Sequence, residues 1–190
     1  MKAPPPSTRQ ELIRVASRLF YEQGFVATGI QQILTEVGIA KGTFYSHFKS
    51  KEELGVCWLQ GRHAVWSEWF EAALQPKRTP ATQLLASYDF LEQWLRESRF
   101  RGCAFINIMA ETPDANSLMR AEVKSHKLGV HQRFQELAIA HQAANGGRAA
   151  RGKSLGTTLY LLFEGALVES QNFCDLWPIH AAREQAKRLL

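Results

Sequence analysis

The stretch TGIQQILTEVGIAKGTFYSHFKSKEEL, residues 28–54, carries the pattern on which the fold prediction rests. Its first apolar residues recur at helical spacing between Ile30 and Val37, and Gly38 then ends this short helix. A second short helix fits AKGTFYSHF, residues 40–48, which begins two residues after that glycine. Two short helices joined by a tight turn that contains glycine are typical of the helix-turn-helix motif.

The second of these helices has two distinct sides. At 100° per residue, Phe48 falls about 40° from Phe44, so both rings are expected to face the protein interior. Four small or medium-sized residues point the other way: Gly42, Thr43, Tyr45 and Ser46. Such a narrow polar surface suits the major groove of DNA, because small residues let the helix backbone approach the base edges.

Capping boxes, in which Ser or Thr precedes Gln or Glu by three residues, predict where further helices begin. They occur at Ser7, Thr28 and Ser50. The first opens an amphipathic helix that ends near Gly24, and the last opens a long helix. Residues 1–54 are therefore predicted to form a three-helix DNA-binding domain.

The remainder of the chain also shows helical spacing almost throughout, and no segment has the pattern of a strand. Helices are predicted over 81–100, 102–111, about 116–144, 154–173 and 179–190, with residues 145–152 as a loop. The segment 154–173 is apolar on nearly all sides, so more than one neighbour must cover it. The expected fold class is all-α, with a second helical domain over 55–190.

The balance of charges permits a nucleic-acid partner without establishing one. The 190 residues include 23 Lys and Arg against 18 Asp and Glu, a net charge of +5. Lys41, Lys49 and Lys51 add three positive charges, and no acidic residue lies among them. Part of the excess is thus concentrated next to the predicted groove-facing helix.

Cysteine spacing and apolar runs favour a cytoplasmic protein. Cys57, Cys103 and Cys174 form no C-x-x-C pair, which argues against a disulfide framework and a zinc site. The start, MKAPPPSTRQELIR, has prolines and charges where a signal peptide needs an apolar run. The longest apolar stretch, residues 159–168, is broken by Glu164 and is too short to span a bilayer. We expect no membrane partner, no metal and no cofactor.

One motif points to a different function. GRAARGKS, residues 147–154, fits the phosphate-loop pattern, in which backbone N–H groups and a lysine bind nucleotide phosphates. That chemistry needs a preceding buried strand, whereas the residues before Gly147 form the end of an amphipathic helix. A solvated basic loop is the preferred interpretation. A nucleotide hydrolase using Gly147–Ser154 is one alternative function, and a helical interaction module without DNA activity is another.

Residues 9–54 closely resemble the DNA-binding signature of the TetR/AcrR family of transcriptional repressors. Beyond residue 60 the similarity is one of helix pattern only. The family often has Ser or Thr where this chain has Ala40, so the recognition helix is expected to lack a side-chain cap worth about 1 kcal/mol. The resemblance implies a homodimeric, ligand-responsive regulator that is no enzyme, most simply a repressor of a palindromic operator in double-stranded DNA.

The resemblance also implies which residues meet DNA. Residues 41–43 would approach base edges, the threonine being able to contact a thymine methyl group. Tyr45, His47 and Lys51 would bind phosphates, as would Thr28 at the start of its helix. The expected DNA-binding set is Thr28, Lys41, Gly42, Thr43, Tyr45, Ser46, His47 and Lys51.

For the second domain, the resemblance implies a dimer formed by the last two long helices and a cavity for a small-molecule effector. Gly156 and Gly165 would allow close approach at the dimer interface, which is expected to contain Leu155, Leu159, Leu162, Phe163, Ala166 and Leu167. Aromatic residues crowd the region 58–134, and a cavity among them would suit an apolar or aromatic effector. The expected effector-binding set is Trp66, Phe70, Trp94, Cys103, Phe105, Met109 and Phe134.

Cys103 is also a candidate reactive residue. It lies at the expected start of a short helix with Arg99 and Arg101 nearby, an environment that lowers the pKa of a thiol. The Gly-Cys pair at this place resembles a subgroup of the family that includes sensors of electrophiles or oxidants. A small buried apolar residue is the alternative interpretation of this cysteine.

Overall fold

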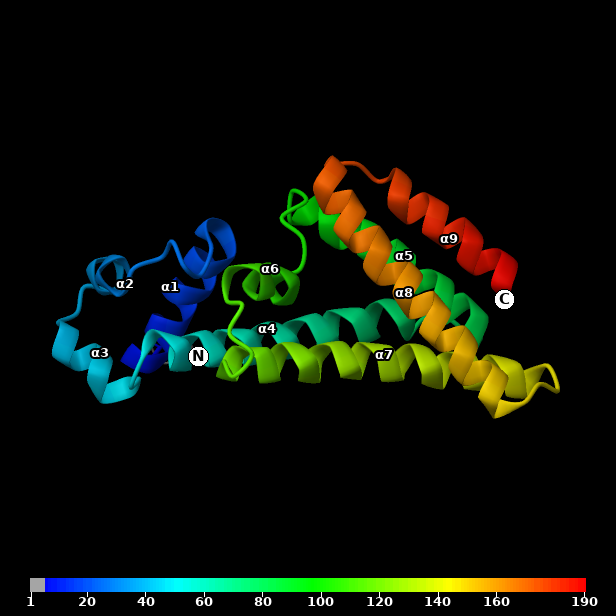
Figure 1. Cartoon of the computed structure of the whole chain (residues 1–190), viewed down its shortest axis with the longest axis horizontal. Helices are drawn as coiled ribbons and strands as arrows, with labels where there is room; N and C mark the ends of the chain where they lie inside the picture. Colours follow the sequence, from blue (N-terminus) through cyan, green and yellow to red (C-terminus); the bar gives the residue numbers. More distant parts are fainter. Residues whose placement is uncertain (1–5) are drawn as a thin grey trace, which may run out of the picture. The chain divides into compact units, whose positions relative to one another are not determined.

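The computed structural model describes residues 6–190, and within them the chain forms α-helices and no strand, as predicted. The helices are α1 Thr8–Gln23, α2 Ile30–Val37, α3 Lys41–His47, α4 Lys51–Leu74, α5 Pro80–Glu97, α6 Ala104–Glu111, α7 Leu118–Ala144, α8 Ala149–Phe173 and α9 Trp177–Leu189 (Figure 1). In this described part of the chain, no helix is long and apolar enough to cross a membrane. Residues 1–5, to which part of the signal-peptide argument belongs, lie outside it.

The helices gather into two compact units. Within the described residues, the first contains the chain from residue 6 to Ala64 together with Ala104–Lys124, and the second contains Val65–Cys103 together with Ser125–Leu190. The units therefore divide within α4 and within α7. The sequence-based division into 1–54 and 55–190 concerns function and stays a prediction.

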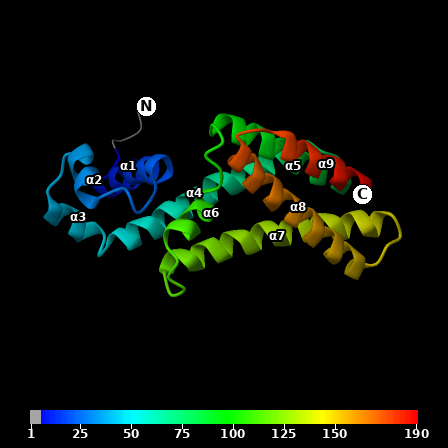
Figure 2. The same cartoon turned by 45° about the horizontal axis from the view of Figure 1, so that its top comes forward.

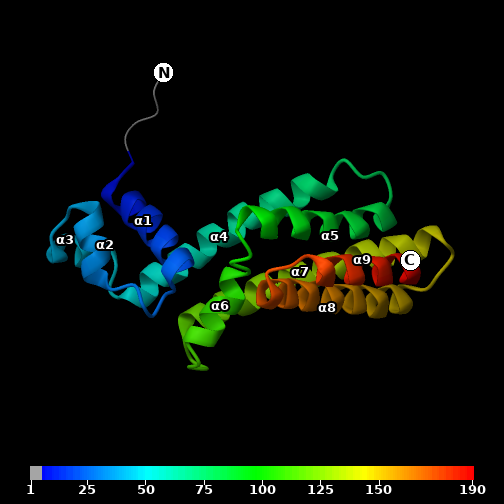
Figure 3. The ribbon, with the colours of Figure 1, turned by 90° about the horizontal axis from the view of Figure 1, so that it is seen from above.

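In the first unit, α1, α2 and α3 form a small helical assembly, called the head below, in which α2 packs against both α1 and α3 (Figure 3). Ser7 Oγ accepts a hydrogen bond from Gln10 N, and the Gln10 side chain accepts one from Ser7 N, so the predicted capping box is confirmed. The buried side of α1 consists of Leu12, Val15, Ala16, Leu19 and Phe20. Gly24 ends the helix with a φ of +99°, which residues with a side chain rarely adopt.

The start of α2 differs from the prediction. Gly29 is the N-cap and no side chain caps the helix, so the predicted capping box at Thr28 is wrong. Thr28 is buried, and its hydroxyl donates a hydrogen bond to the Gly24 carbonyl oxygen at 2.7 Å. The hydroxyl therefore closes the turn between α1 and α2. Gly38 ends α2 in the left-handed region, at the position the sequence indicates.

In the second unit, α8 is covered from several sides, as its apolar composition predicts. Tyr88 on α5 donates a hydrogen bond to the Leu159 carbonyl oxygen on α8 at 2.8 Å, and α9 packs along α8 (Figure 2). Gly152 and Gly156 let α8 approach α7 closely, since a Cβ at Gly156 would lie 2.5 Å from the Cα of Gln135. The close approach predicted for Gly156 therefore occurs within one chain.

This packing makes Gly156→Ala a destabilising change, although alanine normally favours a helix over glycine. We expect the free energy of unfolding to fall by about 1–3 kcal/mol, because the α7 backbone must move away. The matched control is Gly129→Ala on α7, where a Cβ meets open space and stability is expected to rise by up to about 1 kcal/mol. Urea titrations of both variants measure the difference, and a stabilised Gly156→Ala protein would contradict the packing described here.

The phosphate-loop stretch is mostly helical, which corrects the predicted loop over 145–152. Because α8 begins at Ala149, Gly152 and Lys153 lie inside a helix. Gly152 is buried, and a Cβ there would lie 2.6 Å from the Cα of Ile139 on α7. This glycine therefore serves helix packing. Among residues 6–190, no strand precedes it that could present the stretch to a phosphate.

Candidate nucleic-acid interface

Two aromatic rings fix α3 within the head. Phe44 and Phe48 are fully buried, as predicted, with ring centroids 5.8 Å apart. The guanidinium carbon of Arg9 on α1 lies 5.0 Å from the ring centroid of Phe48. The N-cap residue of α3 is Ala40, and no side chain caps the helix, again as predicted. A seven-residue helix of this kind depends on packing for its stability.

The opposite side of α3 is open to solvent. Four of the predicted residues are exposed: Lys41, Gly42, Tyr45 and Ser46. Thr43 and His47 are half-buried at the edges. We call these six residues the groove face. The Tyr45 ring stands edge-on against Phe44 at 5.2 Å and remains 47% exposed.

The chemistry of the groove face matches the needs of a duplex. A Cβ built at Gly42 would meet no atom within 4 Å, so the backbone of the first turn is uncovered. The Ser46 hydroxyl donates a hydrogen bond to the Thr43 carbonyl oxygen at 2.7 Å, which holds this side chain close to the helix backbone. A surface of short polar side chains can approach base edges, and a longer exposed side chain such as Tyr45 is suited to reach a phosphate.

Two residues predicted to bind phosphate are held by the protein itself. Thr28 is buried and its hydroxyl is bonded to the Gly24 carbonyl oxygen, so its side chain does not face solvent here, and its predicted phosphate contact stays a prediction. Lys51, the first residue of α4, is half-buried: its Nζ donates to the Val26 carbonyl oxygen at 3.4 Å and lies 4.4 Å from the Phe25 ring centroid. Burial lowers the pKa of Lys51, while the negative charge of Glu111 acts in the opposite direction.

Sequence reasoning missed the acidic residues of this region. Glu111, the last residue of α6, accepts a hydrogen bond from Val26 N at 2.8 Å, across 85 positions of sequence. Glu52 of α4 accepts hydrogen bonds from Ser117 Oγ at 2.7 Å and from Leu118 N at 2.9 Å. No local motif marks such long-range pairs. They attach the segment 111–118 to the α1–α2 turn and to the start of α4.

Four predicted effector residues share one aromatic cluster in the second unit. Trp66 stacks on Phe70 with ring centroids 4.8 Å apart, and Phe134 lies 6.3 Å from Phe70. Trp94 lies 6.2 Å from Trp66. Phe90, which the predicted set left out, lies 5.3 Å from Phe70. All these rings are buried, so the cluster is a packed part of the core.

Cys103 directly precedes α6 and is buried. An ion pair lies near it, in which Lys127 Nζ donates to Glu164 Oε2 at 2.6 Å. Burial alone would lower the pKa of Lys127, but its electrostatic interactions with Cys103 and Glu164 raise that pKa above its ordinary value. The remaining predicted effector residues, Phe105 and Met109, belong to α6 in the first unit.

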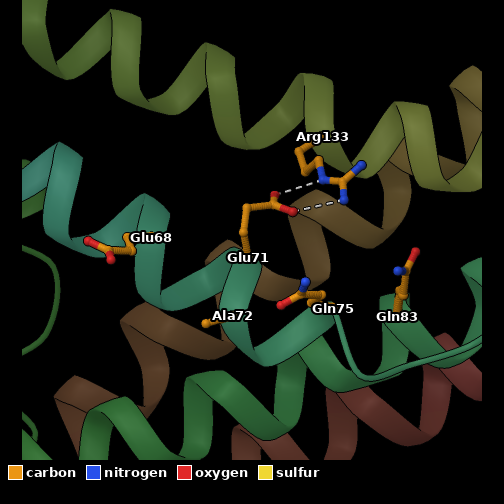
Figure 4. A pocket seen from close by; sticks show the side chains of 6 residues that line it. All are labelled: Glu68, Glu71, Ala72, Gln75, Gln83 and Arg133. Carbon is orange, nitrogen blue, oxygen red and sulfur yellow. Dashed lines mark hydrogen bonds and ion pairs between the residues drawn. The ribbon is translucent and has the colours of Figure 1, made fainter.

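A polar groove opens on the second unit between α4, α5 and α7, with a volume of about 560 Å³ (Figure 4). It is lined by Glu68, Glu71, Ala72, Gln75, Gln83 and Arg133. Figure 4 shows the Arg133 guanidinium reaching the Glu71 carboxylate through two hydrogen bonds, of 2.8 and 2.9 Å. None of the predicted effector residues lines this groove.

The structure divides the predicted dimer residues into buried and outward-facing ones, and the interface itself stays a prediction. Leu159, Phe163 and Leu167 are buried within the single chain, because α5, α7 and α9 pack against α8. A shallow apolar groove of about 280 Å³ lies instead on the outer side of α8 and α9, and we call it the α8–α9 face. It is lined by Leu161, Leu162, Gly165, Ala166, Glu169, Trp177, Pro178, Ala181, Ala182 and Gln185. Of the predicted set, Leu162 and Ala166 belong to this face, and Leu155 lies outside it.

The known proteins that this chain resembles are described as bacterial regulators of transcription. The family model described as "Bacterial regulatory proteins, tetR family" matches residues 12–55. The HTH-type transcriptional regulator LmrA of Bacillus subtilis is 42% identical over 168 residues, 86% of each protein. The HTH-type transcriptional repressor NemR of Escherichia coli is 27% identical over 192 residues, 96% of this chain and 94% of NemR.

Solved structures share the fold. The crystal structure of the reduced form of Escherichia coli NemR has a TM-score of 0.76 at 24% identity, covering 96% of this chain and 97% of that one. SCO4454, described as a TetR-family transcriptional regulator from Streptomyces coelicolor, has a TM-score of 0.78 at 24% identity, covering 95% and 96%.

Proposed function

Because the chain belongs to the TetR family of bacterial regulatory proteins, we propose that it is a dimeric repressor that binds a palindromic operator through its groove face. A small effector would release it from the DNA. The observation that carries this proposal is the arrangement of α3. Two aromatic rings face inward, and a surface of mostly short polar side chains faces solvent. The nucleotide-hydrolase alternative loses its support, since Gly152 lies within α8 and packs against α7.

The α8–α9 face supports the dimer. Leu161 is 62% exposed and Trp177 is 52% exposed, and Phe173 adds a third large apolar side chain 5.4 Å from the Trp177 ring. A monomer would leave this apolar surface in water. The same face of a second copy would cover it through a two-fold axis, which matches two operator half-sites about one DNA turn apart.

The groove face is tested by Tyr45→Ala and Thr43→Val. We expect Tyr45→Ala to weaken binding to all DNA sequences alike by about tenfold, the contribution of one hydrogen bond to a charged phosphate. Thr43→Val should instead change the preference among operator variants, because a group that touches a base carries sequence information. Fluorescence anisotropy measures both, on DNA from upstream of the protein's own gene. Unchanged binding in both variants would count against the groove face and favour an interaction module without DNA activity.

Cys103 supports an electrophilic effector. The Cys103 thiol, which interacts electrostatically with Lys127, can add to a quinone: the quinone C=C π bond opens, a sulfur–carbon bond forms, and the S–H proton passes to the quinone oxygen. We expect Cys103→Ser protein to keep its operator affinity after treatment with 1,4-benzoquinone, while the wild type is released. Cys174→Ser is the matched control, since Cys174 is exposed and its removal should leave the response intact. Equal release of Cys103→Ser and wild type would remove this role.

A further inference from the structure

The turn between α1 and α2 is held from two sides by opposite charges. On one side, Glu111 Oε2 accepts a hydrogen bond from Val26 N at 2.8 Å. The carboxylate lies directly over the turn, because a Cβ at Gly24 would be 3.0 and 3.1 Å from its two oxygens. On the other side, Lys51 Nζ donates to the carbonyl oxygen of the same Val26 at 3.4 Å. One residue of the head is therefore contacted by both an anion and a cation.

This arrangement changes what Lys51 can do. Its ammonium lies over the Phe25 ring at 4.4 Å and is half-buried, so it is folded back onto the protein. A lysine ammonium is a single compact charge on a flexible stem. To bind a DNA phosphate it must leave the turn, and the nearby carboxylate of Glu111 opposes that movement. The negative charge of Glu111 also raises the pKa of Lys51 against the lowering by burial, which shows that the two groups act on each other.

We propose that Glu111 is a positioning residue for DNA binding, whose carboxylate holds Lys51 against Val26 in competition with a DNA phosphate. This inference rests on the proposed function, because it takes the head to be the DNA-binding element. The competition sets how many phosphates each protomer neutralises, and the C-terminal end of α6 controls it. Any movement that withdraws Glu111 from Val26 would free one cation per protomer for the duplex.

The test is Glu111→Gln, which removes the charge but keeps an oxygen that can accept from Val26 N. We expect non-specific DNA affinity at about 0.1 M salt to rise about eightfold per protomer, the contribution of one additional neutralised phosphate. The slope of the logarithm of the binding constant against the logarithm of the salt concentration should become steeper by about 0.9 per protomer. Anisotropy titrations of the full-length protein on a random-sequence duplex, over about 0.05–0.2 M salt, provide both values.

Two further variants separate the inference from simpler explanations. Asp114→Asn makes the same change in net charge three residues later, and Asp114 is exposed with Oδ1 accepting from Asn116 N within its own turn. We expect it to leave the slope unchanged. Lys51→Ala should reduce affinity several-fold more in the Glu111→Gln protein than in the wild type, because only there is the ammonium fully available.

The outcomes are distinguishable. Equal effects of Lys51→Ala with and without Glu111→Gln, or the same gain from Asp114→Asn as from Glu111→Gln, would overturn the role of Glu111. Tyr45→Ala serves as the check on the proposed function in the same titrations. If Tyr45→Ala weakens binding while the Lys51→Ala effects are equal, only the inference fails; if neither variant changes binding, the head is not the DNA-binding element. Thermal unfolding of Glu111→Gln and Glu111→Ala identifies any loss of affinity that comes from an unfolded turn.

Discussion

Phe44→Ala is expected to lower the free energy of unfolding of the head by about 3–5 kcal/mol and to abolish operator binding. The ring is fully buried and contacts both Phe48 and Tyr45, so its removal leaves a cavity under the recognition helix. Because α3 has no side-chain cap, little else holds it in place. Urea unfolding followed by far-UV circular dichroism gives the stability, and anisotropy gives the affinity.

Tyr45→Ala is the matched control for Phe44→Ala. Tyr45 lies next to Phe44 in sequence but is exposed, so its removal should leave stability within about 0.5 kcal/mol while still weakening DNA binding. A Phe44→Ala protein that retains wild-type operator affinity would show that α3 does not read DNA in the proposed orientation.

Leu161→Glu is expected to convert the dimer to a monomer and to weaken operator binding by about 10²–10⁴-fold, since the second half-site is then no longer bound in the same complex. Leu161 is the most exposed of the large apolar residues on the α8–α9 face, and a charge there would be buried against the second copy. Sedimentation velocity reports the oligomeric state.

The matched control is Leu128→Glu on α7. Leu128 is also an exposed leucine, 47% accessible, but it does not line the α8–α9 face. This variant should remain dimeric and bind the operator normally. A dimeric Leu161→Glu protein would place the interface elsewhere on the chain.

Features that depend on local sequence were predictable. The capping box at Ser7, the glycine stops at Gly24 and Gly38, and the inward side of α3 all follow from interactions within a few residues. For the same reason the uncapped start of α3 at Ala40 could be read directly. The family signature in residues 9–54 is made of such local features, which is why it indicated the fold.

Features that depend on tertiary contacts were not predictable in the same way. Thr28 satisfies the capping-box pattern, yet burial of the turn directs its hydroxyl to Gly24. The helix α8 is apolar on nearly every side, so its sequence alone does not tell which side the chain covers and which side a partner covers. Glu111 lies 85 positions from Val26, and no spacing rule connects them.

The short, uncapped recognition helix has a consequence for the motions of the free protein. The backbone amides of α3 are protected by only about two turns of hydrogen bonds and two rings, whereas those of α8 are enclosed by several helices. Local opening of α3 therefore costs less free energy than opening of the second unit, and its amide hydrogens should exchange with solvent long before the interior does. Contact with a duplex would then restrict a helix that fluctuates in the free protein. The conformational entropy lost in this ordering would reduce the net free energy of binding.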